Sequence, residues 1–341
     1  MGKVMLEVNN LKTKYVTRFH EDVYAVDGVS LKIEEGKSLG VAGESGCGKS
    51  TLALSLMGYY FAPLHYISGD IIVDGRKISG MKPDDVRKNI LGNEIAYIPQ
   101  AAMNALNPTQ KIIRFVEDVI HAHDPKMPRK DIYDLAKERF QILGLPEEVL
   151  QKHAVELSGG MKQRVMIAIA LVGSPSIVIA DEPTTSLDVT IEAQILDVLK
   201  NLQKTLGTSI ILITHDLGVI AKLCDRVLVM YGGKIVERGS VDEIFYDTAH
   251  PYTKGLMHSI AKLDTAKGHK LQPIEGTPPD LFAPPKGCPF AARCEYCMEI
   301  CKDMPPQTYE LSKEHETCCW LQHEYAPDTD MRRKVTEKGE V

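Results

Sequence analysis

The chain has 341 residues, of which 44% are hydrophobic and 25% are charged, and its formal net charge at pH 7 is -6. These values are typical of a globular protein with two or three structural units. The acidic balance argues against a protein that coats nucleic acid, so we expect no nucleic-acid partner. No apolar run approaches the length of a membrane span, and residues 1–7 do not have the pattern of a signal peptide. We therefore expect a chain in the cytosol, or one held on the inner face of the membrane by a partner.

The first predicted elements are strands. Residues 4–8 and 29–33 alternate apolar and polar side chains, as half-buried strands do, and residues 39–42 form an apolar run typical of a buried strand. Between the first two lies Tyr15, whose ring could stack on a purine or equally pack against its neighbours at a strand edge. Residues 71–78 predict a hairpin that turns at an Asp-Gly pair.

A glycine-rich stretch follows the apolar run and matches the phosphate-binding pattern G-x-x-x-x-G-K-[ST]. Its members are Gly43, Glu44, Ser45, Gly46, Cys47, Gly48, Lys49, Ser50 and Thr51. The glycines let successive backbone N–H groups point at phosphate oxygens, and the start of a predicted helix at residues 50–57 adds partial positive charge. We expect Lys49 to reach the β- and γ-phosphates and Ser50 to bind Mg²⁺. The alternative is a chance glycine-rich turn before a helix.

Later segments predict an α/β fold. Residues 103–173 show amphipathic helical patterns and indicate a helical insert between two halves of the core. Buried-strand patterns at residues 176–180 and 209–213 flank an amphipathic helix that stops at Gly207, and a hairpin around a Gly-Gly pair follows. This alternation predicts a mixed, largely parallel sheet with ligands at the strand ends, accompanied by an antiparallel β part.

The strand at residues 176–180 leads directly into two carboxylates, Asp181 and Glu182. A strand end beside a phosphate loop is where Mg²⁺ must be held, so we expect Asp181 to bind it, directly or through water. Glu182 points differently and could polarise an attacking water as general base. An Asp-Glu pair after an apolar run is common by chance. It therefore supports a catalytic magnesium site only together with other motifs.

The companion motif is LSGGMKQR at residues 157–164, which resembles the signature motif of the ATP-binding cassette (ABC) ATPases. Ser158, Gly159 and Gly160 offer a hydroxyl and N–H groups at a helix start, a combination suited to gripping a phosphate. The resemblance implies that they grip the γ-phosphate of a nucleotide held by the opposite subunit.

Further motifs of this family occur in its order over residues 4–260. The resemblance implies that Gln100 contacts Mg²⁺ or water and couples to membrane subunits, and that His215 senses the γ-phosphate. It also implies that the loop ending at Asp188 crosses a dimer interface. Tyr15 corresponds to the aromatic residue that stacks on adenine, with Tyr24 as a weaker candidate.

Residues 160–168, 180–190 and 250–253 resemble the dipeptide and oligopeptide importer ATPases, specifically the D-type subunit. This implies an ATP-hydrolysing subunit on the cytoplasmic face of the cell membrane that binds ATP and Mg²⁺. A second ATPase subunit, distinct or identical, two integral-membrane permease subunits and, indirectly, an extracytoplasmic solute-binding protein are the implied partners. Similar importers carry nickel or oligosaccharides, and DNA-repair and translation ATPases share the fold without a transporter. A non-catalytic cassette is a further alternative, against which the intact catalytic residues argue.

Six of the eight cysteines fall between residues 288 and 319. In a reducing compartment this clustering indicates metal ligation rather than disulfides, and the long spacings favour an iron–sulfur cluster over zinc. The segment resembles the [4Fe–4S] extension of peptide-importer ATPases, which implies as ligands Cys288, Cys294, Cys301 and Cys319. Cys318 competes with Cys319 for the last position, Cys297 is surplus, and Cys47 and Cys224 are expected to pack.

These patterns predict a division of the chain into three parts. Residues 1–260 form an ATPase domain that includes the helical insert. Prolines mark a linker after residue 261, so residues 261–327 form a cysteine-rich extension. Residues 328–341 form a charged tail.

Overall fold

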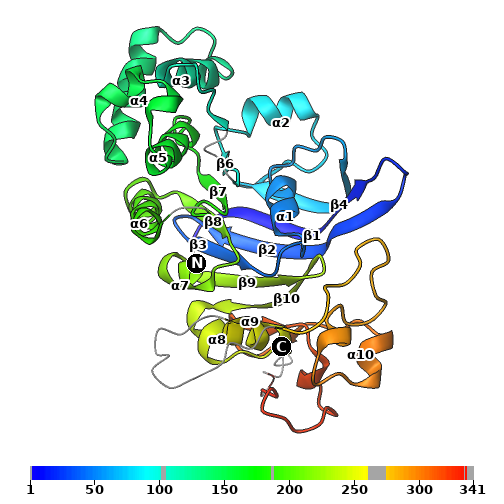
Figure 1. Cartoon of the computed structure of the whole chain (residues 1–341). Coiled ribbons are helices and arrows are strands. Elements are labelled where there is room, and N and C mark those ends of the chain that lie inside the picture. The colour runs from blue at the N-terminus through cyan, green and yellow to red at the C-terminus, as the bar shows by residue number, and fades with distance from the viewer. Residues whose placement is uncertain (1, 101–104, 186–187, 260–273, 334, 336–341) are drawn as a thin grey trace.

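Two sheets enclose a central helix (Figure 1) in the computed structural model, which describes residues 2–100, 105–185, 188–259, 274–333 and 335. Among these residues the larger sheet has eight strands in the order β11-β12-β10-β9-β3-β8-β7-β6. The parallel strands are β3 (Ser38–Ala42), β6 (Ile95–Ile98), β7 (Ile177–Asp181), β8 (Ser209–Ile213) and β9 (Arg226–Tyr231). The antiparallel edge is formed by β10 (Lys234–Ser240), β11 (Tyr309–Glu310) and β12 (Glu316–Thr317).

The smaller sheet is antiparallel, in the order β2-β1-β4-β5. Its strands are β1 (Val4–Val16), β2 (Asp22–Glu34), β4 (Leu64–Val73) and β5 (Arg76–Lys77). The strands predicted at residues 4–8 and 29–33 are confirmed as the first part of β1 and the last part of β2, which are longer and pair with each other. The predicted hairpin is confirmed: Asp74 and Gly75, with φ of 45° and 76°, turn the chain between β4 and β5.

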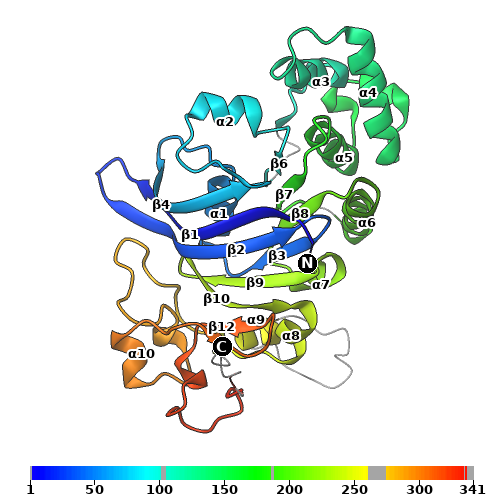
Figure 2. The ribbon, with the colours of Figure 1, turned by 180° about the vertical axis from the view of Figure 1, so that it is seen from behind.

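The helices up to residue 259 lie between the strands in sequence or follow β10. They are α1 (Lys49–Leu56), α2 (Pro83–Asn89), α3 (Ile112–His121), α4 (Arg129–Ile142), α5 (Gly159–Ala170), α6 (Val189–Leu206), α7 (Leu217–Leu223), α8 (Val241–Tyr246) and α9 (Pro251–Ser259). Short 3-10 turns at Glu147–Gln151 and Ala154–Glu156 lead into α5. In two opposite views, α3, α4 and α5 form a lobe beside the β6 edge of the larger sheet (Figures 1 and 2).

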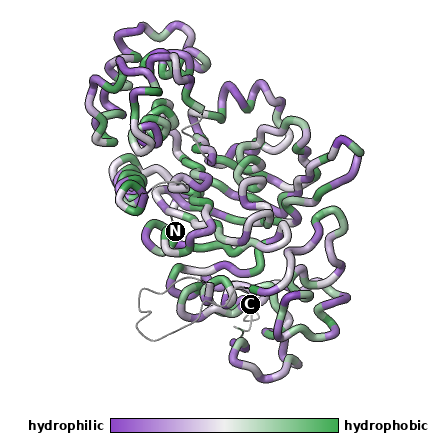
Figure 3. The backbone as a smooth tube through the Cα atoms, viewed as in Figure 1, coloured by the Kyte–Doolittle hydropathy of each residue, from purple (hydrophilic) through white to green (hydrophobic). Residues whose placement is uncertain are grey.

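Each central strand buries both of its faces, which explains its unbroken apolar sequence. In β7, Ile177 and Ile179 pack into the core around α1 between the two sheets, whereas Val178 and Ala180 pack into the core under the helices on the opposite face. Hydrophobic residues accordingly recur along the central strands in Figure 3. This two-faced burial is typical of parallel sheets covered by helices. Within the part of the chain that the structure describes, no helix is both long and apolar enough to span a membrane.

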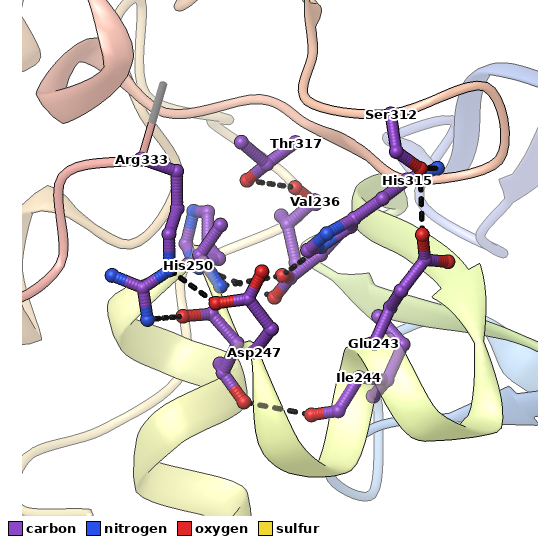
Figure 4. A network of polar contacts seen from close by, with 12 residues as sticks. Val236, Glu243, Ile244, Asp247, His250, Ser312, His315, Thr317 and Arg333 are labelled. Carbon is purple, nitrogen blue, oxygen red and sulfur yellow. Dashed lines mark hydrogen bonds and ion pairs between the residues drawn. The ribbon is translucent and has the colours of Figure 1, made fainter. Parts of the chain in front are cut away.

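The cysteine-rich segment continues the larger sheet and is joined to it by buried polar contacts (Figure 4). It contains α10 (Glu299–Asp303), 3-10 turns at Ala291–Arg293 and Trp320–Gln322, and the strands β11 and β12. Glu237 of β10 accepts hydrogen bonds from His315 Nε2 at 2.8 Å and from the backbone N–H of Ala249 at 2.6 Å. Both Glu237 and His315 are about 1% exposed. Burying two such polar groups is tolerable because each satisfies the other.

Candidate functional site

The glycine-rich stretch forms a tight loop between the buried strand β3 and helix α1. Gly43 and Gly48 have φ of 150° and 104°. A Cβ atom on Gly43 would collide with the carbonyl oxygen of Met230, and one on Gly48 with that of Ala25. Both positions therefore require glycine, for conformation and for space. Ser45, Gly46 and Ser50 are exposed at the mouth of the loop, whereas Cys47 is buried as expected.

Lys49 is the first residue of α1 and its side chain folds back over the loop. Its Nζ donates hydrogen bonds to the carbonyl oxygens of Gly43 at 2.7 Å and Glu44 at 2.9 Å, and Lys49 is 6% exposed. A buried ammonium held by two carbonyls can exchange them for anionic phosphate oxygens, which are stronger partners. The loop therefore has the geometry of a phosphate site with its cation in position.

Asp181 lies at the end of β7, directly beside the phosphate loop. Ser50 Oγ donates to Asp181 Oδ1 and Tyr97 OH donates to Asp181 Oδ2, each at 3.2 Å. Burial raises the pKa of Asp181, against the opposing effect of these two hydrogen bonds. A divalent cation at this position would favour the ionised carboxylate. Mg²⁺ is commonly held by one or two protein oxygens together with phosphates and waters, so the Ser50–Asp181 pair fits that ion.

The carboxylate of Glu182 is hydrogen-bonded to side chains that follow three neighbouring strands. Its Oε1 lies 2.9 Å from His215 Nδ1, and its Oε2 accepts hydrogen bonds from Thr185 at 2.8 Å and Gln100 at 3.1 Å. Its backbone has a φ of 47°, a left-handed conformation that is uncommon for a residue other than glycine. Burial alone would raise the pKa of Glu182, but the contacts with His215 and Thr185 outweigh it and lower the pKa. The carboxylate is therefore ionised at neutral pH, as a general base must be.

The signature residues lie elsewhere in the chain. Ser158 caps α5 by accepting a 3.4 Å hydrogen bond from Met161 N, and the exposed side chain of Ser158 belongs to the helical lobe. In both views β6 and β7 stand between α5 and α1 (Figures 1 and 2). Gly159 is exposed at the start of α5, and Gly160 is buried where a Cβ would meet Ile191. A single chain thus does not join these residues to its own phosphate loop.

The remaining predicted residues are spread around this centre. Asp188 caps α6 through a 2.9 Å hydrogen bond from Ile191 N; residues 186 and 187 of the same motif lie outside the described residues. Tyr15 OH accepts a 3.3 Å hydrogen bond from Thr51 Oγ1, and its contact with adenine stays a prediction. Tyr24 is 37% exposed and its backbone N–H donates to Leu281 O.

Tyr97 and Thr185 are part of the site but were not predicted from the sequence. Tyr97 stands within β6, where an aromatic residue is explained by packing alone, and Thr185 stands three residues after Glu182. One indication was available in the sequence: side chains alternate between the two faces of a strand. This alternation places Tyr97 and Pro99 on one face and Ile98 on the other. Only the pairing of β6 with β7 brings Tyr97 to Asp181.

The four favoured cysteines lie around one small cavity. Cys288, Cys294, Cys301 and Cys319 line it with His250 and Phe290. Cys318 instead contacts Thr308 Oγ1 at 3.4 Å and lines a different cavity. Burial raises the thiol pKa to about 11 at Cys288 and about 12 at Cys294. Within the described residues, however, no group of three or more His, Cys, Asp or Glu side chains is positioned to hold a metal ion, so ligation stays a prediction.

A phosphate loop, an acidic strand end with a glutamate beyond it, and a separate helical lobe that carries a phosphate-gripping motif define an ATPase of the ABC class. Residues 26–185 match the ABC transporter family, and residues 236–301 match the C-terminal region of the oligopeptide/dipeptide transporters. The chain belongs to the ATP-binding proteins of the oligopeptide/dipeptide ABC transporter family.

Individual relatives match along nearly the whole chain. The chain is 42% identical to the oligopeptide transport ATP-binding protein OppD of Bacillus subtilis over 337 residues, which is 98% of this chain and 93% of that protein. It is 44% identical to the dipeptide transport ATP-binding protein DppD of the same organism over 331 residues, 96% of this chain and 97% of that protein.

Solved ABC cassettes match the ATPase core. The dimeric cassette MJ0796 in a post-hydrolysis state with ADP and phosphate has a TM-score of 0.61 and 28% identity over 70% of this chain and 99% of that chain. CbiO1 from Clostridium perfringens, part of the transporter complex cbiONQ, has a TM-score of 0.61 and 28% identity over 72% of this chain and 92% of that chain. The chain is therefore an ATPase with the ABC fold.

Proposed function

We propose that this chain hydrolyses ATP to energise the import of dipeptides or oligopeptides across the cytoplasmic membrane. The observation that carries the hydrolysis is the arrangement of Glu182, held by three side chains, beside the Ser50–Asp181 pair and the phosphate loop. Peptides are proposed as the solute because the relatives are named for oligopeptide and dipeptide transport.

The proposed roles follow from the groups that each residue offers. Lys49 holds the β- and γ-phosphates, and Ser50 and Asp181, assisted by Gln100, hold Mg²⁺. Glu182 takes a proton from the attacking water, and His215, hydrogen-bonded to the same carboxylate, orients it and contacts the γ-phosphate. Positioning and charge stabilisation supply most of the rate in such a reaction, so these few contacts suffice.

A complete site is proposed to require two ATPase chains. The exposed Ser158 and Gly159, at the start of α5, would contact the γ-phosphate on the partner, and the loop ending at Asp188 would lie at the same interface. The dimeric state of the similar cassette MJ0796 supports this arrangement. In peptide importers the second chain is expected to be a related but distinct ATPase, with a second copy of this chain as the alternative.

Permease subunits are proposed to hold the chain on the cytoplasmic face of the membrane. An apolar cleft of about 490 Å³ lies between β6 and the helical lobe, lined by residues that include Tyr97, Ile120, Met127 and Ala170. An apolar cleft of this kind can receive a protruding segment of a partner. The cleft shares Tyr97 with the proposed magnesium site, so a partner seated there would contact a side chain that is hydrogen-bonded to Asp181. The extracytoplasmic solute-binding protein would act through those permeases.

The cysteine-rich extension is proposed to hold a [4Fe–4S] cluster through Cys288, Cys294, Cys301 and Cys319. The donor set fits, because the three buried cysteines and the half-buried Cys294 line one cavity. A second observation supports a polar occupant: His250, which lines this cavity, is 1% exposed, and its Nε2 has no hydrogen-bond partner within the described part of the chain. The cavity holds only about 10 Å³, so the thiols would have to move outward to bind a cluster. A cluster would supply mainly structural cross-linking. We also propose that the chain divides into an ATPase domain up to residue 260, a cysteine-rich extension up to residue 327 and a charged tail.

Reconstitution of the full transporter tests the function. Wild-type chain, partner ATPase and permeases are inserted into liposomes with the binding protein, and uptake of a labelled tripeptide is compared with uptake of an oligosaccharide and of Ni²⁺. We expect ATP-dependent uptake of the peptide alone. Uptake of one of the other solutes would reassign the substrate, and ATPase activity independent of any permease would favour a non-transport ATPase.

A further inference from the structure

The phosphate loop contains an acidic residue, Glu44, directly after Gly43. A triphosphate bound in this loop brings several negative charges close to that carboxylate. An unpaired carboxylate in a partly buried site would repel them, because the local dielectric screens less than water does. Glu44 therefore needs a compensating cation if the loop is to bind nucleotide well.

That cation is Arg293, which lies 249 positions later in the cysteine-rich extension. Its Nη1 donates to Glu44 Oε2 at 2.6 Å and its Nη2 donates to Glu44 Oε1 at 3.0 Å, a bidentate pair. The Arg293 side chain is 4% exposed and that of Glu44 is 27% exposed. The hydrogen bond to Glu44 is the main cause of the raised pKa of Arg293.

Every N–H of the Arg293 guanidinium is engaged. Besides Glu44, Nη1 donates to Tyr231 OH at 3.2 Å, Nη2 to Ile274 O at 3.0 Å and Nε to Glu275 O at 2.9 Å. The guanidinium carbon also lies 5.8 Å from the centre of the Tyr231 ring. These contacts fix the orientation of the guanidinium without help from Glu44, so Arg293 is pre-organised to receive the carboxylate.

A second contact holds the backbone of the same residue. The N–H of Glu44 donates to Tyr252 OH at 2.8 Å, and Tyr252 of α9 is fully buried. The Tyr252 ring packs against Tyr231 at 4.4 Å and Phe290 at 5.3 Å between ring centres. The side chain and the backbone of Glu44 are thus both held by residues that follow the ATPase motifs in sequence.

We propose that Arg293 is a positioning residue of the nucleotide site, which neutralises Glu44 and holds the first turn of the phosphate loop ready for a triphosphate. The proposal rests on the proposed function in taking ATP as the ligand. It makes nucleotide affinity depend on the cysteine-rich extension, although that segment carries none of the ATPase motifs. The role is electrostatic, so removing the carboxylate should compensate for removing the arginine.

The test is a double-mutant cycle on the purified full-length chain, read as the dissociation constant for Mg²⁺-ATP. We expect Arg293→Gln to weaken binding about tenfold, because it leaves a carboxylate unpaired beside the phosphates. The double variant Glu44→Gln with Arg293→Gln should regain most of that affinity. In the assembled transporter, Arg293→Gln should raise the KM for ATP while leaving kcat at saturating ATP nearly unchanged.

Arg333→Gln is the matched control. Arg333 also lies in the C-terminal part of the chain and forms a 2.6 Å ion pair, but with Asp247 of the ATPase core and not with the phosphate loop. We expect this variant to lower thermal stability without changing ATP affinity. If Arg293→Gln fails to fold, Arg293→Lys, with and without Glu44→Gln, replaces it in the cycle, and the same compensation is expected on a smaller scale.

Two results would overturn the proposal. One is an Arg293 variant that folds and binds ATP as wild type does. The other is a double variant that binds as weakly as the Arg293 single variant, because the loss would then come from structure and not from charge. Failure of the wild-type chain to bind ATP at all would instead contradict the proposed function.

Discussion

Replacing Glu182 with glutamine is the sharpest perturbation of the catalytic centre. The substitution keeps the size of the side chain but removes its capacity to take a proton. The contacts with Thr185 and Gln100 converge on one oxygen and that with His215 on the other, and an amide retains a single acceptor oxygen. A general base contributes about two to four orders of magnitude in rate. The expected loss therefore corresponds to about 3 to 5 kcal/mol of activation free energy.

The assay separates binding from turnover. ATP hydrolysis is measured in the assembled transporter, and Mg²⁺-ATP affinity is measured on the isolated chain. Glu182→Gln should bind nucleotide and fail to hydrolyse it, whereas Lys49→Ala should bind poorly, because it removes the ammonium that faces the phosphates. Glu148→Gln, at an exposed carboxylate in the helical lobe, is the control and should behave as wild type. Hydrolysis by Glu182→Gln at the wild-type rate would refute the assignment of the base.

The pH dependence of hydrolysis gives an independent check. The pKa of Glu182 is lowered in the folded chain, so its carboxylate stays ionised, and its contacts stay in place, as the pH falls to the ordinary range of glutamate. Loss of rate caused by protonation of Glu182 should therefore begin below about pH 4.5. Loss of rate that already begins near pH 6 would contradict Glu182 as the group whose protonation stops the reaction.

Two further predictions concern the partner chain and the cysteines. Ser158→Arg should impair hydrolysis in the assembled transporter but leave ATP binding to the isolated chain intact, and loss of binding in the isolated chain would contradict a two-chain site. Chain purified without oxygen should contain about four irons, as a [4Fe–4S] cluster requires. Cys319→Ser should lose this iron while Cys318→Ser retains it; stoichiometric zinc without iron, or the reverse pattern for the two variants, would contradict the ligand assignment.

Features that depend on neighbouring residues could be predicted from the sequence. The phosphate loop lies between a strand and a helix as expected, because its glycines and the flanking apolar run specify that geometry locally. The helix predicted to stop at Gly207 does end there, with Gly207 in the left-handed conformation at a φ of 64°. The strand predicted at residues 209–213 matches β8 from end to end.

Features that depend on distant pairing could not be predicted in this way. Tyr97 reaches Asp181, which lies 84 positions later, only because β6 pairs with β7. The cysteine-rich segment extends the ATPase sheet through β12, although the prolines before it indicated a separate unit. Two-residue strands such as β11 and β12 carry too little periodicity to be recognised from the sequence. The buried Glu237–His315 contact beside them joins residues 78 positions apart, which no local pattern indicates.

The extension is therefore mechanically continuous with the nucleotide site. Arg293 directly precedes Cys294 in the chain, and Cys288 N donates a 2.7 Å hydrogen bond to Cys301 O, so the cysteine loops form one connected unit. Because the guanidinium of Arg293 has no free N–H, a movement of Cys294 cannot be absorbed by rotating that side chain without breaking a hydrogen bond. One of these partners is Glu44, which lies on the phosphate loop and receives two of the five hydrogen bonds. A change in the cysteine loops would consequently reach the phosphate loop through the Arg293–Glu44 pair.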